Sequence, residues 1–250
     1  MKIAISISGL PRCYKEGYKE LKKWFLDKYD CDVYIHTWYD TNTIFQTGHK
    51  FAPYKSYSFT EDDYQSVLKL YQPKNYTFQK PIPFDNNGIV SKLGVKLNVS
   101  LSTFYSLQHS YNLVKQSGIE YDYVIKTRFD LKFTDYISPE CLFLKDLTLL
   151  DPNKLHYFQY SDNPNDRVSE IDDLFAVSSM DVMEVYTSTF SYMLNYLYMN
   201  NEYIEWLSNL VPDPEPLVNE SLLKFHLLKN NISLNPISSL TEYFTTHILR

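Results

Sequence analysis

The order of elements at the start of the chain restricts its possible folds more than any other feature. Residues 2–8 have the sequence KIAISIS, in which apolar and small side chains alternate as in a β-strand. Residues 14–29 carry apolar side chains at helical spacing, and residues 32–38 return to a strand pattern with DVYIHTW. Two strands joined through a helix pair in parallel with a right-handed crossover. The sequence therefore predicts an α/β fold.

A second helix and strand repeat this arrangement. Residues 98–117 carry a broad apolar stripe, and Gly118 supplies a helix stop. Residues 121–133 have the sequence YDYVIKTRFDLKF, which begins as a buried strand of aromatic and β-branched residues. The strand then reaches a cation and a carboxylate two residues apart, Arg128 and Asp130. We expect it to lie at the centre of the sheet.

Arg128 and Asp130 are the strongest candidates for a ligand site. Side chains two residues apart on a strand lie on the same face, so this pair is predicted to face one space. In open α/β sheets, ligands bind at the carboxyl ends of the strands. An arginine fork suits phosphate oxygens, and a carboxylate suits a divalent cation that also holds phosphates. An equally consistent interpretation is a plain ion pair that closes the strand.

The turn after the first strand is a weaker candidate. Ser6, Ser8, Gly9 and Arg12 are placed to line a nucleotide pocket, with Arg12 on phosphate. One glycine is not a glycine-rich phosphate loop. The missing G-x-G-x-x-G motif argues against a Rossmann methyltransferase, and the missing GxxxxGK[ST] motif excludes a Walker-type kinase.

The remaining elements are predicted from shorter patterns. Helices are expected at residues 60–70, 180–197 and 219–228, and short strands at 76–79, 155–160 and 232–234. Asn219 is the expected cap of the last helix. Residues 39–60 are polar and uneven, which indicates a long surface excursion. Residues 80–96 are a candidate lid, because long loops in compact domains are often functional.

Asp173 is a further candidate site residue. Residues 170–179 read EIDDLFAVSS, so two carboxylates precede a short apolar run. A carboxylate held at a sheet edge can act as a general base or anchor an acceptor. An acidic cap on a buried strand or turn fits the same spacing.

Charge and cysteine content exclude several classes of protein. The net charge is −6 and no long Lys/Arg face is present, which argues against a general nucleic-acid binder. Cys13, Cys31 and Cys141 form no metal-ligand spacing, and an odd number of thiols suits a reducing, cytosolic compartment. No stretch has the ~18 consecutive apolar residues of a membrane span, so at most peripheral membrane contact is expected.

The aromatic content has two interpretations. The chain holds 23 tyrosines and 15 phenylalanines against 6 glycines. Such an excess can form sugar-stacking surfaces, because tyrosine has an apolar face and a polar tip. An AT-biased genome produces the same excess through its codons, and we favour this second interpretation.

Several stretches, taken in order, resemble a group of small glycosyltransferases from bacterial capsule and lipopolysaccharide clusters and from glycan clusters of large DNA viruses. The resemblance extends over residues 1 to about 240 and rests on 3–12 (IAISISGLPR), 32–38 (DVYIHTW), 104–106 (FYS), 121–130 (YDYVIKTRFD), 173–177 (DLFAV) and 219–223 (NESLL). It implies a GT-A-like (Rossmann-like), three-layer α/β/α single domain over residues 1–250 with a mixed central sheet. Residues 1–133 would then form the nucleotide-binding half and residues 134–250 the acceptor-side half.

The resemblance also implies a chemistry. Such enzymes use a nucleotide-sugar donor, usually with Mn²⁺ or Mg²⁺, and a glycan or other hydroxyl acceptor, as in polysaccharide biosynthesis. Arg128 and Asp130 hold the place of the usual Asp-x-Asp motif, with Asp130 as metal ligand and Arg128 in place of the first carboxylate. Asp173 is the candidate base for the acceptor hydroxyl, and Glu220 is the second candidate or an acceptor-binding group. A cytoplasmic location is expected, in the host if the protein is viral. The alternative is a non-catalytic nucleotide- or glycan-binding module of the same fold.

Overall fold

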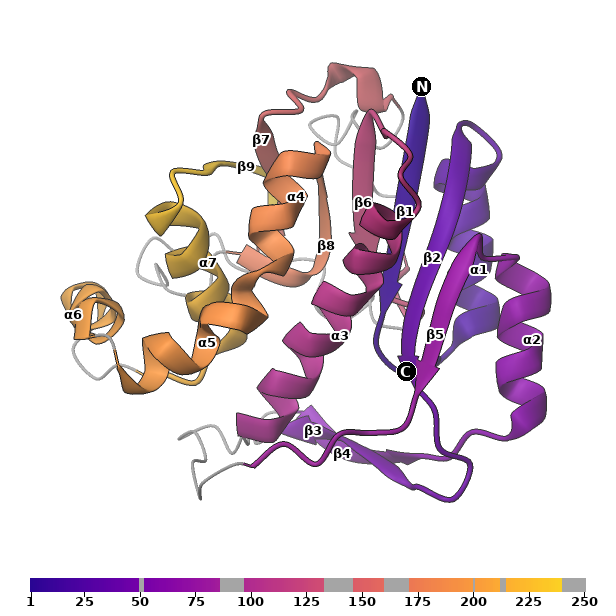
Figure 1. Cartoon of the computed structure of the whole chain (residues 1–250), viewed down its shortest axis with the longest axis horizontal. Coiled ribbons are helices and arrows are strands. Elements are labelled where there is room, and N and C mark those ends of the chain that lie inside the picture. Colours follow the sequence, from indigo (N-terminus) through magenta and orange to yellow (C-terminus); the bar gives the residue numbers. More distant parts are fainter. Residues whose placement is uncertain are drawn as a thin grey trace.

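The fold is built on a seven-stranded mixed sheet with the strand order β5-β2-β1-β6-β8-β7-β9 (Figure 1). The computed structural model describes residues 1–49, 52–85, 97–132, 146–159, 171–199, 201–211 and 215–239. The strands are β1 (Lys2–Ser8), β2 (Asp30–Trp38), β5 (Asn75–Gln79), β6 (Tyr123–Thr127), β7 (Lys154–Gln159), β8 (Ile171–Ser178) and β9 (Ser233–Ser239). β5, β2, β1 and β6 pair in parallel, whereas β8 is antiparallel to both β6 and β7.

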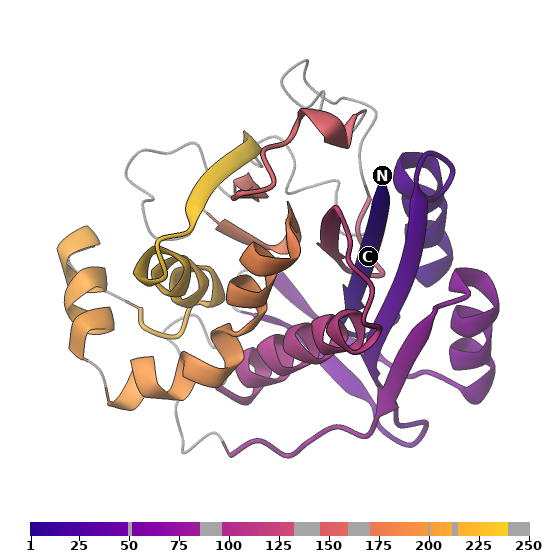
Figure 2. The same ribbon diagram turned by 45° about the horizontal axis from the view of Figure 1, so that its top comes forward.

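Helices cover both faces of the sheet (Figures 1 and 2). They are α1 (Tyr14–Leu21), α2 (Glu61–Tyr71), α3 (Leu97–Gln116), α4 (Met180–Thr187), α5 (Thr189–Tyr198), α6 (Asn201–Leu210) and α7 (Asn219–Lys229). One buried cluster packs α1 and α2 against one face of the sheet. A second cluster packs the helices α3, α4, α5, α6 and α7 on the other face. This arrangement confirms the predicted three-layer α/β/α fold with a mixed sheet. Within the part of the chain that the structure describes, no helix is both long and apolar enough to cross a bilayer.

Two of the helix predictions were too long. In place of the helix expected over 14–29, the α-helix α1 ends at Leu21 and a π-helical segment follows over Lys22–Leu26. The helix expected over 180–197 is divided at Ser188 into α4 and α5. The Ser188 hydroxyl donates to the carbonyl of Val185 in the preceding turn, a contact that commonly bends helices. α6 was not predicted.

The surface excursion expected over 39–60 contains a separate β-hairpin that was not predicted. β3 (Phe45–His49) and β4 (Ala52–Tyr57) pair antiparallel and form their own two-stranded sheet. The predicted cap of α7 was also wrong, since Val218 occupies that position and the Asn219 side chain bonds elsewhere. Most of the predicted lid, residues 86–96, lies outside the described residues, as does Cys141.

Gly17 allows α1 to pack against the loop that carries Arg128 and Asp130. A Cβ atom built on Gly17 would lie 1.7 Å from the carbonyl oxygen of Phe129. Glycine is otherwise unfavourable inside a helix, by about 1 kcal/mol relative to alanine. The glycine therefore permits close packing of α1 against the loop after β6.

Gly17→Ala is expected to destabilise the protein by at least about 1–3 kcal/mol, because the added methyl group forces the Phe129 backbone to move. Denaturant unfolding measures the change in the free energy of unfolding. Lys19→Ala on the exposed side of α1 is the matched control and should change it little. A Gly17→Ala protein that is more stable than wild type, as helix propensity alone would give, contradicts this packing role.

Candidate functional site

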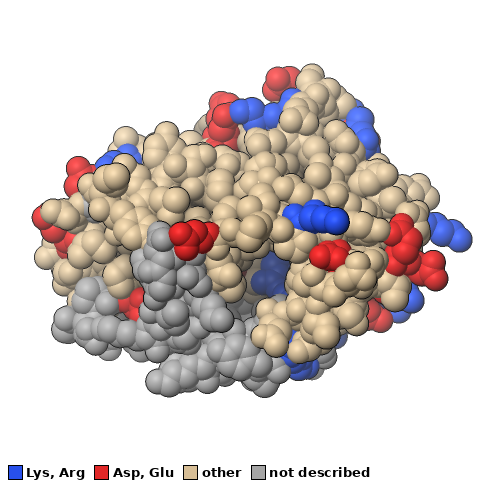
Figure 3. Space-filling view, turned by 60° about the horizontal axis from the view of Figure 1, so that its bottom comes forward, with Lys and Arg blue, Asp and Glu red and all other residues tan. Residues whose placement is uncertain are grey.

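A cavity of about 350 Å³ opens at the carboxyl ends of β1 and β6. It is enclosed by the turn after β1, the start of the β3–β4 hairpin, α3 and β8. Figure 3 shows this side of the molecule, with basic side chains inside the hollow. The lining includes Ser8, Gly9, Leu10, Arg12, Trp38, Phe45, Gln46, Pro81, Ile82, Asn98, Ser102, Thr103, Ser106, Lys126, Arg128 and Asp173.

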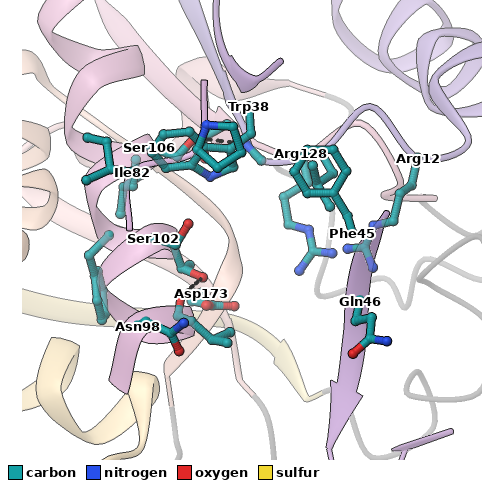
Figure 4. A pocket seen from close by; sticks show the side chains of 18 of the residues that line it. Arg12, Trp38, Phe45, Gln46, Ile82, Asn98, Ser102, Ser106, Arg128 and Asp173 are labelled. Carbon is teal, nitrogen blue, oxygen red and sulfur yellow. Dashed lines mark hydrogen bonds between the residues drawn. The ribbon is translucent and has the colours of Figure 1, made fainter. Parts of the chain in front are cut away.

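One end of the cavity carries two arginines held by one carboxylate. Arg128 donates from Nε to Asp130 Oδ1 at 2.9 Å and from Nη2 to Oδ2 at 2.8 Å. Arg12 Nη2 lies 2.8 Å from the same Oδ2 atom. The Asp130 side chain is 2% exposed, so it lies behind the two guanidinium groups. Figure 4 shows both guanidinium groups beside each other, near Phe45.

The position of Arg12 depends on contacts from distant parts of the chain. Gly9 has a φ of +102°, which an L-residue rarely adopts, and its N–H donates to Ser106 Oγ of α3 at 3.1 Å. The guanidinium carbon of Arg12 lies 5.4 Å from the centre of the Tyr57 ring, on the hairpin. Burial lowers the pKa of Arg12, while Asp130 opposes this effect. Because the ordinary pKa of arginine exceeds 12, the group remains a cation.

Lys126 adds a third cation that the sequence analysis missed. It lies on β6 opposite Ser6 of β1, is 3% exposed, and lines the cavity. The sequence offered a signal, because Lys126 lies two residues before Arg128. The expected strand alternation does not extend to Asp130, however, since β6 ends at Thr127 and Asp130 lies in the following turn.

The other wall of the cavity accepts hydrogen bonds. Asp173 on β8 accepts a bond from the Asn219 side-chain amide at 3.2 Å. Among the described residues, the side-chain oxygens of Asn98 and Asn219 are buried and receive no hydrogen bond. Figure 4 shows Asp173 beside Asn98 and Ser102 of α3, across from the arginines. Asn98, Ser102 and Asp173 line this end of the cavity, so their side chains can bond hydroxyl groups of a ligand.

An aromatic stack supports the wall between these two ends. Trp38 stacks on Tyr105 with ring centres 5.4 Å apart, and Tyr105 stacks on His109 at 3.7 Å. His36 beneath them bonds through Nδ1 to Ser106 Oγ at 2.8 Å and through Nε2 to Gln79 at 3.2 Å. These contacts fix Trp38 as a flat apolar surface on the cavity wall.

His36 is expected to make the protein sensitive to acid. Burial lowers the pKa of His36 to about 4 from its ordinary 6.5, with a smaller lowering by His109 and an opposing contribution from Gln79. Below pH 6.5 the unfolded chain binds a proton that the folded protein takes up only near pH 4. The stability associated with neutral His36 is therefore complete above pH 6.5 and is lost, by roughly 3 kcal/mol, as the pH falls to 4.

His36→Asn tests this expectation, because asparagine keeps a polar group near Ser106 Oγ and does not titrate. Urea unfolding between pH 7.5 and 4 should show a smaller loss of stability in the variant than in wild type. Identical pH profiles for the two proteins would mean that His36 already titrates normally.

The structure brings together most of the residues predicted from the sequence. Ser8, Gly9, Arg12, Arg128 and Asp173 all line the one cavity. Asp130 forms the ion pair with Arg128 that was one of its two interpretations, also contacts Arg12, and is absent from the lining. Glu220 is also absent from the lining, although its neighbour Asn219 bonds to Asp173.

The described residues do not fit the divalent cation that the family resemblance implies. Both oxygens of Asp130 are engaged by guanidinium groups, and the carboxylate is buried. No group of three His, Cys, Asp or Glu side chains suited to a metal occurs within the described ranges. Mn²⁺ and Mg²⁺ need several oxygen ligands around one point.

No family model and no curated protein matches the sequence. Solved structures with a similar fold include the apo form of mouse xyloside xylosyltransferase 1, at 8% identity and a TM-score of 0.43, covering 94% of this chain and 83% of that one. Apo GlyE, a glycosyltransferase of Streptococcus pneumoniae TIGR4, is 11% identical with a TM-score of 0.35, covering 94% of this chain and 44% of that one. A glycosyltransferase involved in glycosylation of the major capsid of PBCV-1 is 10% identical with a TM-score of 0.37, covering 90% and 99%. At these identities and TM-scores the likeness carries no argument, so function has to be inferred from the cavity.

Proposed function

We propose that this protein is a GT-A-type glycosyltransferase that moves a sugar from a nucleotide-sugar donor to a hydroxyl acceptor. The observation that carries the proposal is the division of one cavity into a cationic end and a hydrogen-bond-accepting end. Arg12, Arg128 and Lys126 form the first, and Asp173 lies at the second. A nucleotide sugar has the complementary order, with a diphosphate followed by a ring of hydroxyl groups.

The cationic end stabilises the leaving group. In the reaction the bond between the anomeric carbon and the phosphate oxygen breaks, and the diphosphate leaves with the electron pair. Charge therefore develops on the diphosphate, where Arg12 and Arg128 are already oriented. Such preorganised electrostatic stabilisation is usually the largest contribution to catalysis. The nucleobase lies near residues 6–12, with Trp38 as a stacking surface.

The accepting end holds the sugar and activates the acceptor. As the acceptor oxygen bonds to the anomeric carbon, its proton passes to the carboxylate of Asp173, which acts as general base if the reaction inverts the anomeric centre. Asn219 orients this carboxylate through its amide. Asn98 and Ser102, which line this end of the cavity, form hydrogen bonds with the sugar hydroxyls.

The expected location remains the cytoplasm, within the host if the protein is viral. Cys13 and Cys31 are thiols and not half-cystines, which is compatible with a reducing compartment. The substrates are a nucleotide sugar and a glycan or other hydroxyl acceptor.

A ligand panel followed by a turnover assay tests the function. UDP, GDP, CMP and dTDP compounds are each added to the full chain, and the bound nucleotide raises the melting temperature by mass action. The corresponding sugar nucleotides are then assayed for release of the nucleoside phosphate. Nucleotide binding together with release of the nucleoside phosphate supports a transferase. Nucleotide binding without such release, whichever acceptor is added, supports a non-catalytic binding module. No rise with any nucleotide would contradict the proposal.

A further inference from the structure

Resting on the proposed function, we infer that Arg12 and Arg128 bind the donor diphosphate in place of a divalent cation, with Asp130 as the buried anion that orients them. Asp130 then never touches the donor. It is a positioning residue, and the two guanidinium groups are the phosphate ligands.

The first support is the use of the Asp130 oxygens. Three charge-assisted contacts at 2.8–2.9 Å reach this carboxylate, two from Arg128 and one from Arg12. Its side chain is 2% exposed. A metal ion could bind there only by displacing a guanidinium group and entering a closed space. Removing one partner from a buried ion pair leaves an uncompensated charge, which is strongly unfavourable.

The second support is the sign of the charge around the cavity end. Arg12, Arg128 and Lys126 all line it, and Asp130 contacts the two arginines. Of the described residues that line the cavity, Arg12, Lys126 and Arg128 are basic, and the acidic Asp173 lies across the cavity from the arginines. A divalent cation is repelled by this arrangement, whereas a diphosphate is attracted to it.

The third support is the geometry of the arginines. A guanidinium group has five N–H donors in a rigid fork, so two arginines can serve Asp130 and a diphosphate at once. Both guanidinium groups lie beside each other facing the cavity. Asp130 contacts both guanidinium groups and the Tyr57 ring contacts that of Arg12, so both are oriented before the ligand arrives. Preorganisation of this kind reduces the cost of binding.

Calorimetric titration of the full chain with UDP, GDP, CDP and dTDP tests the inference. Each nucleotide is titrated in EDTA and again with excess Mn²⁺ or Mg²⁺. For the nucleotide that binds, we expect affinities within about threefold of each other in the three conditions. An affinity at least tenfold higher with metal overturns the inference and leaves the proposed function standing. Absence of binding in every condition overturns both.

Charge variants identify the ligands of the diphosphate. Arg128→Met should lower the affinity for the nucleoside diphosphate by about 10²-fold, since charge-assisted bidentate contacts are among the strongest hydrogen bonds. Affinity for the matching nucleoside, which has no phosphate, should be unchanged in the same variant, which shows that the protein is folded. Arg128→Lys keeps the charge and should restore part of the loss. Lys19→Met, a cation removed from the exposed side of α1, is the matched control. Equal affinities for the diphosphate in wild type and Arg128→Met would overturn the inference.

Discussion

Exchange of Asp130 for asparagine is expected to lower the free energy of unfolding by about 3–5 kcal/mol, the usual cost of removing one member of a buried ion pair. Asparagine has nearly the same shape as aspartate, so the loss comes from charge and not from volume. Arg12 and Arg128 would lie side by side with no anion between them at Asp130. Nucleoside diphosphate affinity should fall as well, because the guanidinium groups lose their orientation.

Urea denaturation of the variant measures the loss of stability. Asp27→Asn is the matched control, because the ion pair of Asp27 with Lys22 is exposed and such pairs contribute about 0–1 kcal/mol. Addition of Arg12→Met to Asp130→Asn should recover part of the stability by removing the excess charge, and the coupling follows from a double-mutant cycle. Similar small losses in Asp130→Asn and Asp27→Asn would mean that Asp130 does not hold the arginines.

Exchange of Asp173 for asparagine is expected to lower kcat by about 10²–10⁴, the range for a lost general base. The amide cannot take up the acceptor proton at neutral pH. Nucleotide affinity should barely change, since Asp173 lies across the cavity from Arg12 and Arg128. The measurements are steady-state transfer with the donor identified by the ligand panel, and nucleotide titration of the same variant.

Two neighbouring carboxylates serve as comparisons for Asp173. Asp172→Asn removes a charge one residue away and should cost little activity. Equal losses in the Asp172 and Asp173 variants would indicate a shared electrostatic role. A larger loss in Glu220→Gln would move the base to α7, where Glu220 follows the Asn219 that bonds Asp173.

Local patterns were sufficient for the central strands, two of the helices and the edge of the sheet that carries the cavity. Alternation predicted the strand at residues 2–8, and helical spacing with caps predicted α2 and α3. Arg12 and Arg128 follow parallel strands, so their meeting could also be expected, because the carboxyl ends of adjacent parallel strands lie at one edge. These features depend on residues close together in the chain, or on a simple rule of topology.

The roles within the cavity depended on contacts that no spacing encodes. Asn219 meets Asp173 from 46 residues away, and Gly9 meets Ser106 from 97 residues away. From the sequence, Asp130 was equally suited to bind a divalent metal ion or to pair with an arginine. In the structure its oxygens contact two guanidinium groups. Periodicity reports which face of an element is buried, but the charge that a buried carboxylate faces is set by packing between distant segments. The chain pattern therefore predicted the edge of the sheet at which the cavity lies, whereas the tertiary structure paired Asp130 with the two arginines and placed Asp173 in the cavity lining.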